Sequence, residues 1–230
     1  MLATEKKFVS IAIDGASGAG KSTLSKMLAK ELGYIYVDTG ALYRAFALYL
    51  LKENINIKDE YRIKQIIDNN KVKLEIKYIK GEQHVFVNNK DESGNIRTPE
   101  VSMAASRISA LSMVRSFLFD TQKNLAKTNN VIMDGRDIGT VVLPRANIKI
   151  YLTASSEARA KRRLKELNEN GINITYEEVL SDMNKRDYND SHRSVAPLLK
   201  ASDAIVVDTT NLTLDGSFIA LKNIIKDRIG

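Results

Sequence analysis

The sequence has no cysteine and only two histidines among its 230 residues. The absence of cysteine excludes disulfide bonds, thiolate metal sites and cysteine nucleophiles. No apolar run approaches the roughly 18 residues that a membrane-spanning helix needs. Residues 1–10, which include Lys6 and Lys7, lead into a strand pattern and lack the features of a secretory signal. We therefore expect a cytoplasmic protein that does not enter a membrane.

The chain also lacks any run of five or more positively charged residues, although its formal net charge is +7. A positive charge suits either nucleic-acid binding or a site that holds several phosphate groups. Scattered charge gives no continuous stripe for a nucleic-acid backbone. We therefore expect small phosphorylated ligands and no nucleic acid.

Apolar, β-branched segments alternate with helical patterns along most of the chain, and this order builds a parallel sheet with helices on both faces. The predicted strands are residues 8–14, 34–37, 131–134, 148–152 and 204–207. The predicted helices are residues 21–32, 39–53, 99–127, 156–168, 176–187 and 214–229. The segment 54–97 differs, because Val72, Leu74 and Ile76 alternate with charged residues. That alternation predicts a small antiparallel insertion within a single α/β domain.

The strongest motif follows the first predicted strand, where the letters GASGAGKS match G-x-x-x-x-G-K-[ST] in full. The glycines let backbone N–H groups turn toward phosphate oxygens, Lys21 can reach the β- and γ-phosphates, and Ser22 can offer its hydroxyl to Mg²⁺. A chance glycine turn would lack the apolar strand before it and the helix after it. The predicted ATP-binding residues are Gly15, Ala16, Ser17, Gly18, Ala19, Gly20, Lys21, Ser22 and Thr23.

An acidic residue, Asp134, ends the apolar run VIMD. A carboxylate in this place can hold Mg²⁺ through water, so Asp134 and Ser22 are the predicted metal ligands. The alternative is that Asp134 only caps the next turn. The letters NKRD at residues 184–187 spell the guanine motif of GTPases, but they lie in a polar helical stretch and not after an apolar strand. We interpret that match as coincidence.

Arginines are the remaining signal. A phosphate acceptor is already largely dianionic at neutral pH (second pKa about 6), so transfer to it needs positive charge more than a base. Arginine is always charged and can bind two oxygens at once. Any one arginine alone is better explained as a surface charge, but several flank turns or strand ends, where open α/β sheets place their sites. The set comprises Arg44, Arg115, Arg136, Arg159, Arg162, Arg163, Arg186 and Arg193.

Three blocks of sequence together resemble bacterial cytidylate kinases. They are DTGALYR at residues 38–44, DGRDIGT at residues 134–140, and Arg186-Asp187 followed by RSVAPL at residues 193–198. The likeness covers nearly the whole chain, with the blocks in order and at the expected spacing. One departure is Ala16, which stands where the family often has proline and should leave the chemistry unchanged.

The resemblance implies a P-loop NTPase fold of three layers, with a five-stranded parallel sheet and a helical lid at residues 155–193. It also implies that the insertion at 54–97 belongs to the monophosphate-binding region. The expected substrates are ATP, with Mg²⁺ as cofactor, and CMP or dCMP. A monomer is expected.

The resemblance also assigns roles to individual residues. Thr39, Arg44 and Arg136 would hold the CMP phosphate; Ser106, Arg115 and Asp137 would read cytosine; Arg186 and Asp190 would contact ribose, with Arg193 in the same block; Arg159 and Arg163 would close over ATP. The catalytic set would be Lys21, Arg136, Arg159, Arg163 and Arg186. The alternatives left open are a thymidylate or adenylate kinase, which would differ in the base pocket, and a nucleotide-dependent nucleic-acid-binding protein.

Overall fold

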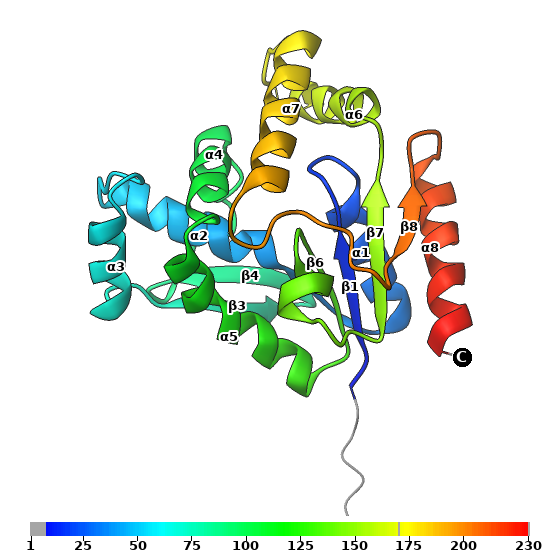
Figure 1. Cartoon of the computed structure of the whole chain (residues 1–230), viewed down its shortest axis with the longest axis horizontal. Helices are drawn as coiled ribbons and strands as arrows, with labels where there is room; N and C mark the ends of the chain where they lie inside the picture. Colours follow the sequence, from blue (N-terminus) through cyan, green and yellow to red (C-terminus); the bar gives the residue numbers. More distant parts are fainter. Residues whose placement is uncertain (1–7, 170, 230) are drawn as a thin grey trace, which may run out of the picture.

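The computed structural model describes residues 8–169 and 171–229 (Figure 1). Its strands are β1 (Ser10–Asp14), β2 (Ile35–Asp38), β3 (Leu74–Ile79), β4 (Glu82–Val87), β5 (Lys90–Asp91), β6 (Val131–Gly135), β7 (Ile148–Thr153) and β8 (Ile205–Asp208). Its α-helices are α1 (Lys21–Leu32), α2 (Thr39–Lys52), α3 (Glu60–Asp68), α4 (Pro99–Ile108), α5 (Ser112–Thr128), α6 (Ser156–Glu169), α7 (Tyr176–His192) and α8 (Leu214–Ile229). A short π-helical turn, η1, spans Ile138–Val142.

The predicted five strands form one parallel sheet in the order β2-β6-β1-β7-β8. The central strand β1 is buried on both faces: Ile11 and Ile13 pack against α1 and α8, whereas Ala12 packs toward η1 and α5. Strands covered on both sides read as continuous apolar runs, which is why they were recognisable in the sequence. The predicted three-layer α/β fold is confirmed.

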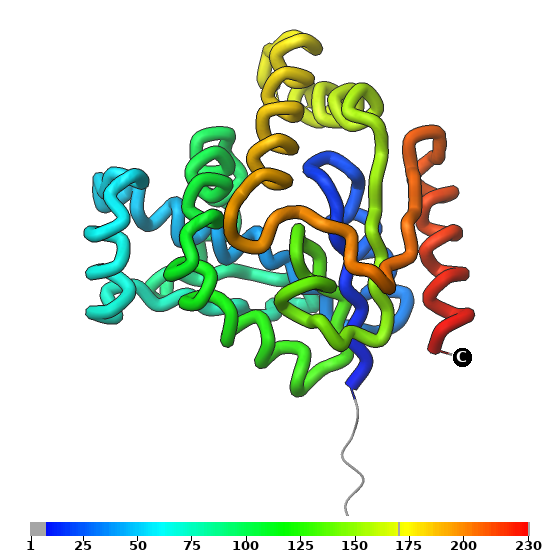
Figure 2. The backbone as a smooth tube through the Cα atoms, in the orientation of Figure 1, coloured from blue at the N-terminus to red at the C-terminus, as the bar shows by residue number. Residues whose placement is uncertain are grey.

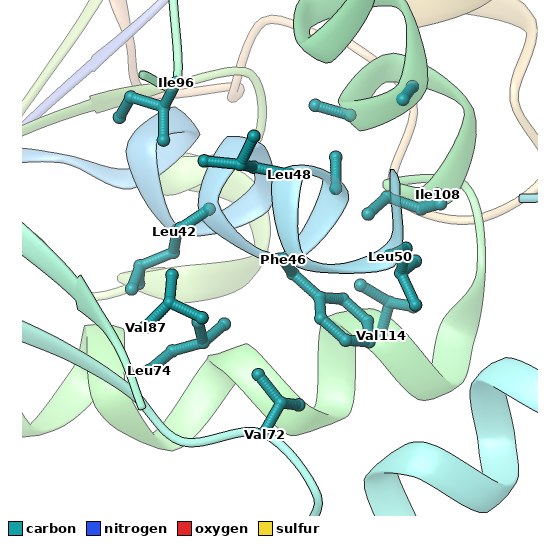
Figure 3. Close-up of a cluster of buried hydrophobic side chains, with 14 of the residues drawn as sticks. Leu42, Phe46, Leu48, Leu50, Val72, Leu74, Val87, Ile96, Ile108 and Val114 are labelled. Carbon is teal, nitrogen blue, oxygen red and sulfur yellow. The ribbon is translucent and has the colours of Figure 1, made fainter. Parts of the chain in front are cut away.

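The insertion contains the predicted antiparallel sheet, with strands in the order β3-β4-β5. Lys80-Gly81 and Asn88-Asn89 make its turns, and all four residues have positive φ. The sheet packs on α2 around the fully buried Phe46 (Figure 3). This second core holds the insertion against α2.

Three details of the predicted helices were wrong. The insertion also contains a helix, α3, which Asp59 caps by accepting from the backbone N–H of Arg62. The helix predicted at 99–127 is two helices, α4 and α5, separated by a turn at residues 109–111. The third difference is that α7 runs five residues beyond the predicted end at residue 187.

Helices α6 and α7 form a hairpin above the carboxyl end of β7 (Figure 1). Ala160, Leu167, Val179 and Met183 form a small core of their own between the two helices. Figure 2 traces the chain from β7 up into this hairpin and back down to β8. The hairpin therefore stands over the edge of the sheet where the glycine-rich loop lies.

Candidate active site

The glycine-rich loop joins β1 to α1. Gly15 has φ +151°, and a Cβ there would lie 2.0 Å from the carbonyl oxygen of Leu152, so only glycine fits. Lys21 is 6% exposed, and its Nζ donates to the carbonyl oxygen of Ala16 at 2.6 Å. Burial, reinforced by the positive charge of Arg136, lowers the pKa of Lys21 to about 7. A triphosphate in the loop would supply the negative charge that this ammonium group needs.

Asp134 ends β6 beside the first turn of α1. Its carboxylate accepts hydrogen bonds from Ser22 Oγ at 2.8 Å and from the Tyr36 hydroxyl at 3.2 Å. Burial, together with the charge of nearby Asp38, raises the pKa of Asp134 to about 6.

These oxygens fit a magnesium ion that arrives with a nucleotide. Mg²⁺ in such sites takes one or two carboxylates and completes its shell with phosphate and water oxygens. Ser22 and Asp134 offer one hydroxyl and one carboxylate. No cluster of three or more His, Cys, Asp or Glu that could hold a metal ion occurs in residues 8–169 and 171–229. The nucleotide phosphates would therefore have to supply the remaining ligands.

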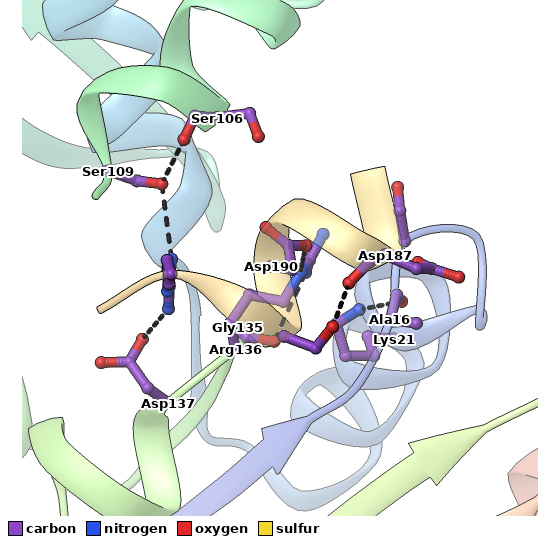
Figure 4. A network of polar contacts seen from close by, with 12 residues as sticks. Ala16, Lys21, Ser106, Ser109, Gly135, Arg136, Asp137, Asp187 and Asp190 are labelled. Carbon is purple, nitrogen blue, oxygen red and sulfur yellow. Dashed lines mark hydrogen bonds and ion pairs between the residues drawn. The ribbon is translucent and has the colours of Figure 1, made fainter. Parts of the chain in front are cut away.

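The turn after β6 carries Arg136 and Asp137, two residues predicted to bind the acceptor nucleotide. Arg136 Nε donates to Asp190 Oδ2 at 2.7 Å, which joins this turn to α7 (Figure 4). Burial alone would raise the pKa of Asp190, but the charges of Arg136, Arg186 and Arg193 together lower it. Thr39 lies at the same strand end, because its Oγ1 donates to the carbonyl oxygen of Asp134 at 2.8 Å.

Asp137 lies between two arginines. Arg115 pairs with its Oδ2, and the NH2 of Arg193 lies 3.5 Å from its Oδ1. Burial raises the pKa of Asp137, and Arg115 and Arg193 reduce that rise. Ser109 Oγ donates to the carbonyl oxygen of Ser106 at 2.8 Å and accepts from Arg193 at 3.4 Å. Of the predicted cytosine-reading residues, Arg115 and Asp137 thus lie in one buried polar cluster, to which Ser106 contributes its backbone carbonyl oxygen (Figure 4).

Arg44 lies on α2 and faces Asp38. Its NH2 donates to Asp38 Oδ2 at 2.7 Å, and the NH2 of Arg97 donates to the same oxygen at 3.1 Å. Burial would raise the pKa of Asp38, but Arg44 and Arg97, helped by the N–H of Ala41 and the charge of Lys26, lower it overall. Within the described part of the chain, the buried Nε of Arg44 has no hydrogen-bond partner. Arg44 therefore keeps a donor available for an anion.

Two arginines of the α6–α7 hairpin differ in their surroundings. The buried Nε of Arg186 has no hydrogen-bond partner among the described residues. Burial and the charge of Arg136 lower the pKa of Arg186 to about 10. Arg163 forms an ion pair at 2.8 Å with Glu166, one helical turn along, and its side chain is 33% exposed.

The third, Arg159, is engaged within the protein. It is 5% exposed, and it donates to the carbonyl oxygens of Ala154 and Ser17 at 2.9 and 3.0 Å. It also binds both carboxylate oxygens of Asp187, at 3.2 and 2.6 Å. The backbone of Gly18 packs here too, since a Cβ on it would lie 3.2 Å from the Cβ of Arg159. Arg159 therefore links the hairpin to the glycine-rich loop.

Residues 11–226 match the family model described as cytidylate kinase. The chain belongs to the cytidylate kinase family. Proteins named cytidylate kinase from Caldicellulosiruptor saccharolyticus and Lactobacillus johnsonii are 51% and 47% identical to it. The alignments cover 91% of this chain and 92% of the first protein, and 95% of this chain and 94% of the second.

A solved structure shares the fold at low identity. It is an uncharacterized protein from Eubacterium ventriosum that is 13% identical, with a TM-score of 0.53. The likeness covers 96% of this chain and 99% of that one.

For a member of the cytidylate kinase family, the structure adds polar residues at the site that were not predicted. Asp14 and Asp38 each end a strand, which is the signal that drew attention to Asp134. Arg97 and Ser109 carry no comparable signal, since their place depends on how the insertion and the α4–α5 turn fold back.

Proposed function

We propose that this chain transfers the γ-phosphoryl group of ATP to CMP or dCMP, giving ADP and CDP or dCDP. The observation that carries the proposal is the group of buried and half-buried cations around the glycine-rich loop. Lys21 and Arg186 both have lowered pKa values, and Arg136 contributes to both shifts. Buried like charges destabilise one another until anions join them. The phosphates of two nucleotides would meet that need.

The polar cluster around Asp137 supports cytosine as the base. Cytosine presents an amino group that an ionised carboxylate accepts, and Arg115 and Arg193 can donate to its acceptor atoms. Uracil would place a carbonyl oxygen against the carboxylate. A site built for one hydrogen-bond pattern can reject the other by orders of magnitude.

The chemistry follows from charge placement. An oxygen of the acceptor phosphate attacks the γ-phosphorus, the bond to the β–γ bridging oxygen breaks, and ADP leaves. The acceptor is already anionic, so no strong base is required. Lys21, Arg136 and Arg186 would offset the repulsion between the two nucleotides and the charge on the transferring group. Mg²⁺, held by Ser22 and Asp134, would neutralise phosphate charge.

The hairpin and the insertion have proposed places in this scheme. Residues 155–193 would act as a lid that brings Arg163 to ATP and excludes water, which could otherwise accept the phosphoryl group. Residues 54–97 would support the monophosphate side, where Arg44 lies. Arg186 and Asp190 would contact the ribose of the acceptor nucleotide.

A coupled spectrophotometric assay with ATP, Mg²⁺ and each nucleoside monophosphate tests the function. We expect CMP and dCMP to be used far better than UMP, AMP or dTMP. Preference for AMP or dTMP would assign the chain to another branch of the P-loop kinases. ATP hydrolysis without an acceptor preference would contradict the proposal.

We also propose that the protein works as a cytoplasmic monomer on free nucleotides. The scattered positive charge, without a run of five or more basic residues, supports small ligands over nucleic acid. Light scattering at working concentrations, with and without nucleotides, tests the monomer.

A further inference from the structure

Asp14 is a buried carboxylate to which the proposed reaction assigns no role. It is the last residue of β1, directly before Gly15, and is 5% exposed. Its two oxygens accept from the backbone N–H groups of Ile138 at 2.8 Å and Gly139 at 2.7 Å. Asp14 therefore joins the strand that carries the glycine-rich loop to a turn 124 residues further along the chain.

The turn that Asp14 holds is the one that carries Arg136 and Asp137. Its backbone is unusual, because Val142 donates to the carbonyl oxygen of Asp137, five residues back. The two N–H groups that donate to Asp14 belong to the first two residues of this π-helical turn. The two hydrogen bonds thus fix the backbone immediately after Asp137.

The fit around Asp14 is close. A Cβ on Gly139 would lie 3.3 Å from Asp14 Oδ2 and 3.1 Å from Cδ of Lys149. Burial raises the pKa of Asp14 to about 6, and the hydrogen bonds from the two backbone N–H groups limit that rise. Although burying its charge is unfavourable, a carboxylate provides two acceptor oxygens here, which a neutral amide cannot do.

We propose that Asp14 is a positioning residue for the acceptor nucleotide. By holding the start of η1, it sets where Arg136 and Asp137 stand relative to the glycine-rich loop, and so how the two phosphates face each other. The inference rests on the proposed CMP kinase activity. Asp14 touches neither nucleotide in this scheme, and it acts through the backbone of the turn.

The test is Asp14→Asn in the full chain. The amide keeps one acceptor oxygen but turns an N–H toward the second N–H of the turn. A displacement of about 1 Å can cost on the order of a hundredfold in rate. We expect kcat/KM for CMP to fall by about tenfold to a hundredfold. KM for CMP should rise while KM for ATP stays within about twofold, and the preference for CMP over UMP should shrink.

Asp203→Asn is the matched control, because Asp203 pairs with Lys149 near the same sheet but is 61% exposed at its side chain. It should leave both KM values unchanged. If Asp14→Asn does not fold, Gly139→Ala applies the same test from the other side, since its methyl group presses on Asp14. Equal losses for ATP and CMP, or an unchanged CMP/UMP ratio, would overturn the positioning role. A wild-type protein that does not phosphorylate CMP would instead overturn the proposed function.

Discussion

At the scale of single residues, the state of Lys21 before ATP binds has a measurable consequence. Its ammonium group donates to the carbonyl oxygen of Ala16 in the same glycine-rich loop, and burial lowers its pKa to about 7. A bound triphosphate would bring negative charge next to it and raise that pKa. ATP binding should therefore be linked to protonation of Lys21.

We predict that ATP binding at pH 8 takes up close to one proton. With a pKa of about 7 in the free protein, Lys21 is mostly neutral at pH 8, and it becomes charged in the complex. The terminal phosphate, with a second pKa of about 6, releases almost none at this pH. Calorimetry in buffers of different ionisation enthalpy measures the number. Lys21→Arg keeps the charge at all pH values, so equal uptake by that variant would contradict the assignment.

Asp137 leads to a prediction about specificity. Replacing it by asparagine removes the carboxylate that would accept from the cytosine amino group. Because an amide can turn either its N–H or its oxygen to the base, Asp137→Asn should lower kcat/KM for CMP by about a hundredfold and UMP much less. Steady-state kinetics on both substrates measures the ratio, and an unchanged ratio would remove Asp137 from base recognition.

At the scale of elements, the α6–α7 hairpin is tied to the glycine-rich loop through Arg159. The hairpin has its own small core, so it can keep its shape while its attachment changes. The bidentate pair with Asp187 spans both helices, and the bond to Ser17 reaches the loop. The guanidinium of Arg159 is therefore a poor candidate for direct contact with ATP unless the hairpin moves, whereas Arg163 pairs with Glu166 along its own helix face.

We predict that Asp187→Asn weakens ATP binding more than CMP binding. The variant keeps one acceptor for Arg159 but loses the charge that orients it, so the loop at Ser17 is held less firmly. KM for ATP should rise roughly tenfold, with KM for CMP changing by less than about threefold. Glu169→Gln, which breaks an exposed pair with Lys165 on the same hairpin, is the control. Equal rises in both KM values would argue for general loosening.

The elements also mark how far the sequence alone could go. The parallel strands and the loop followed from their apolar runs and glycines, because both faces of the sheet are covered. Helix α3 was missed because only Ile63 and Ile66 of its nine residues are buried. The break between α4 and α5 contains no glycine or proline, and η1 depends on the distant carboxylate of Asp14. Such contacts leave no local pattern.

At the scale of the whole molecule, a few of the cations that make up the net charge of +7 lie out of reach of solvent, among them Lys21 beside the glycine-rich loop. Arg44 and Arg186 each leave a buried Nε without a partner among the described residues. Repulsion among such cations lowers the stability of the free protein, and phosphate ligands remove it. Stability and function are therefore opposed at this site.

Arg186→Met should make the free protein more stable and inactive. The substitution removes a half-buried cation whose pKa is lowered by burial and by Arg136, and it keeps most of the side-chain volume. Discounted for its partial exposure, the gain should be about 1–2 kcal/mol, which for a chain of this size raises Tm by roughly 2–8 °C. Differential scanning calorimetry and the coupled assay measure the two effects.

The same variant should respond less to ligand. In the wild type, CMP at a hundredfold excess over its Kd should stabilise the protein by about 2.7 kcal/mol and so raise Tm. Cytidine, which lacks the phosphate, should not raise Tm. Arg186→Met should start from a higher Tm and gain little from CMP. The adjacent, exposed Lys185→Met is the control and should match the wild type in both respects. A lower Tm for Arg186→Met, or full retention of its CMP response, would show that the charge of Arg186 is already compensated within the protein. Removing a cation stabilises the protein only where no anion compensates its charge.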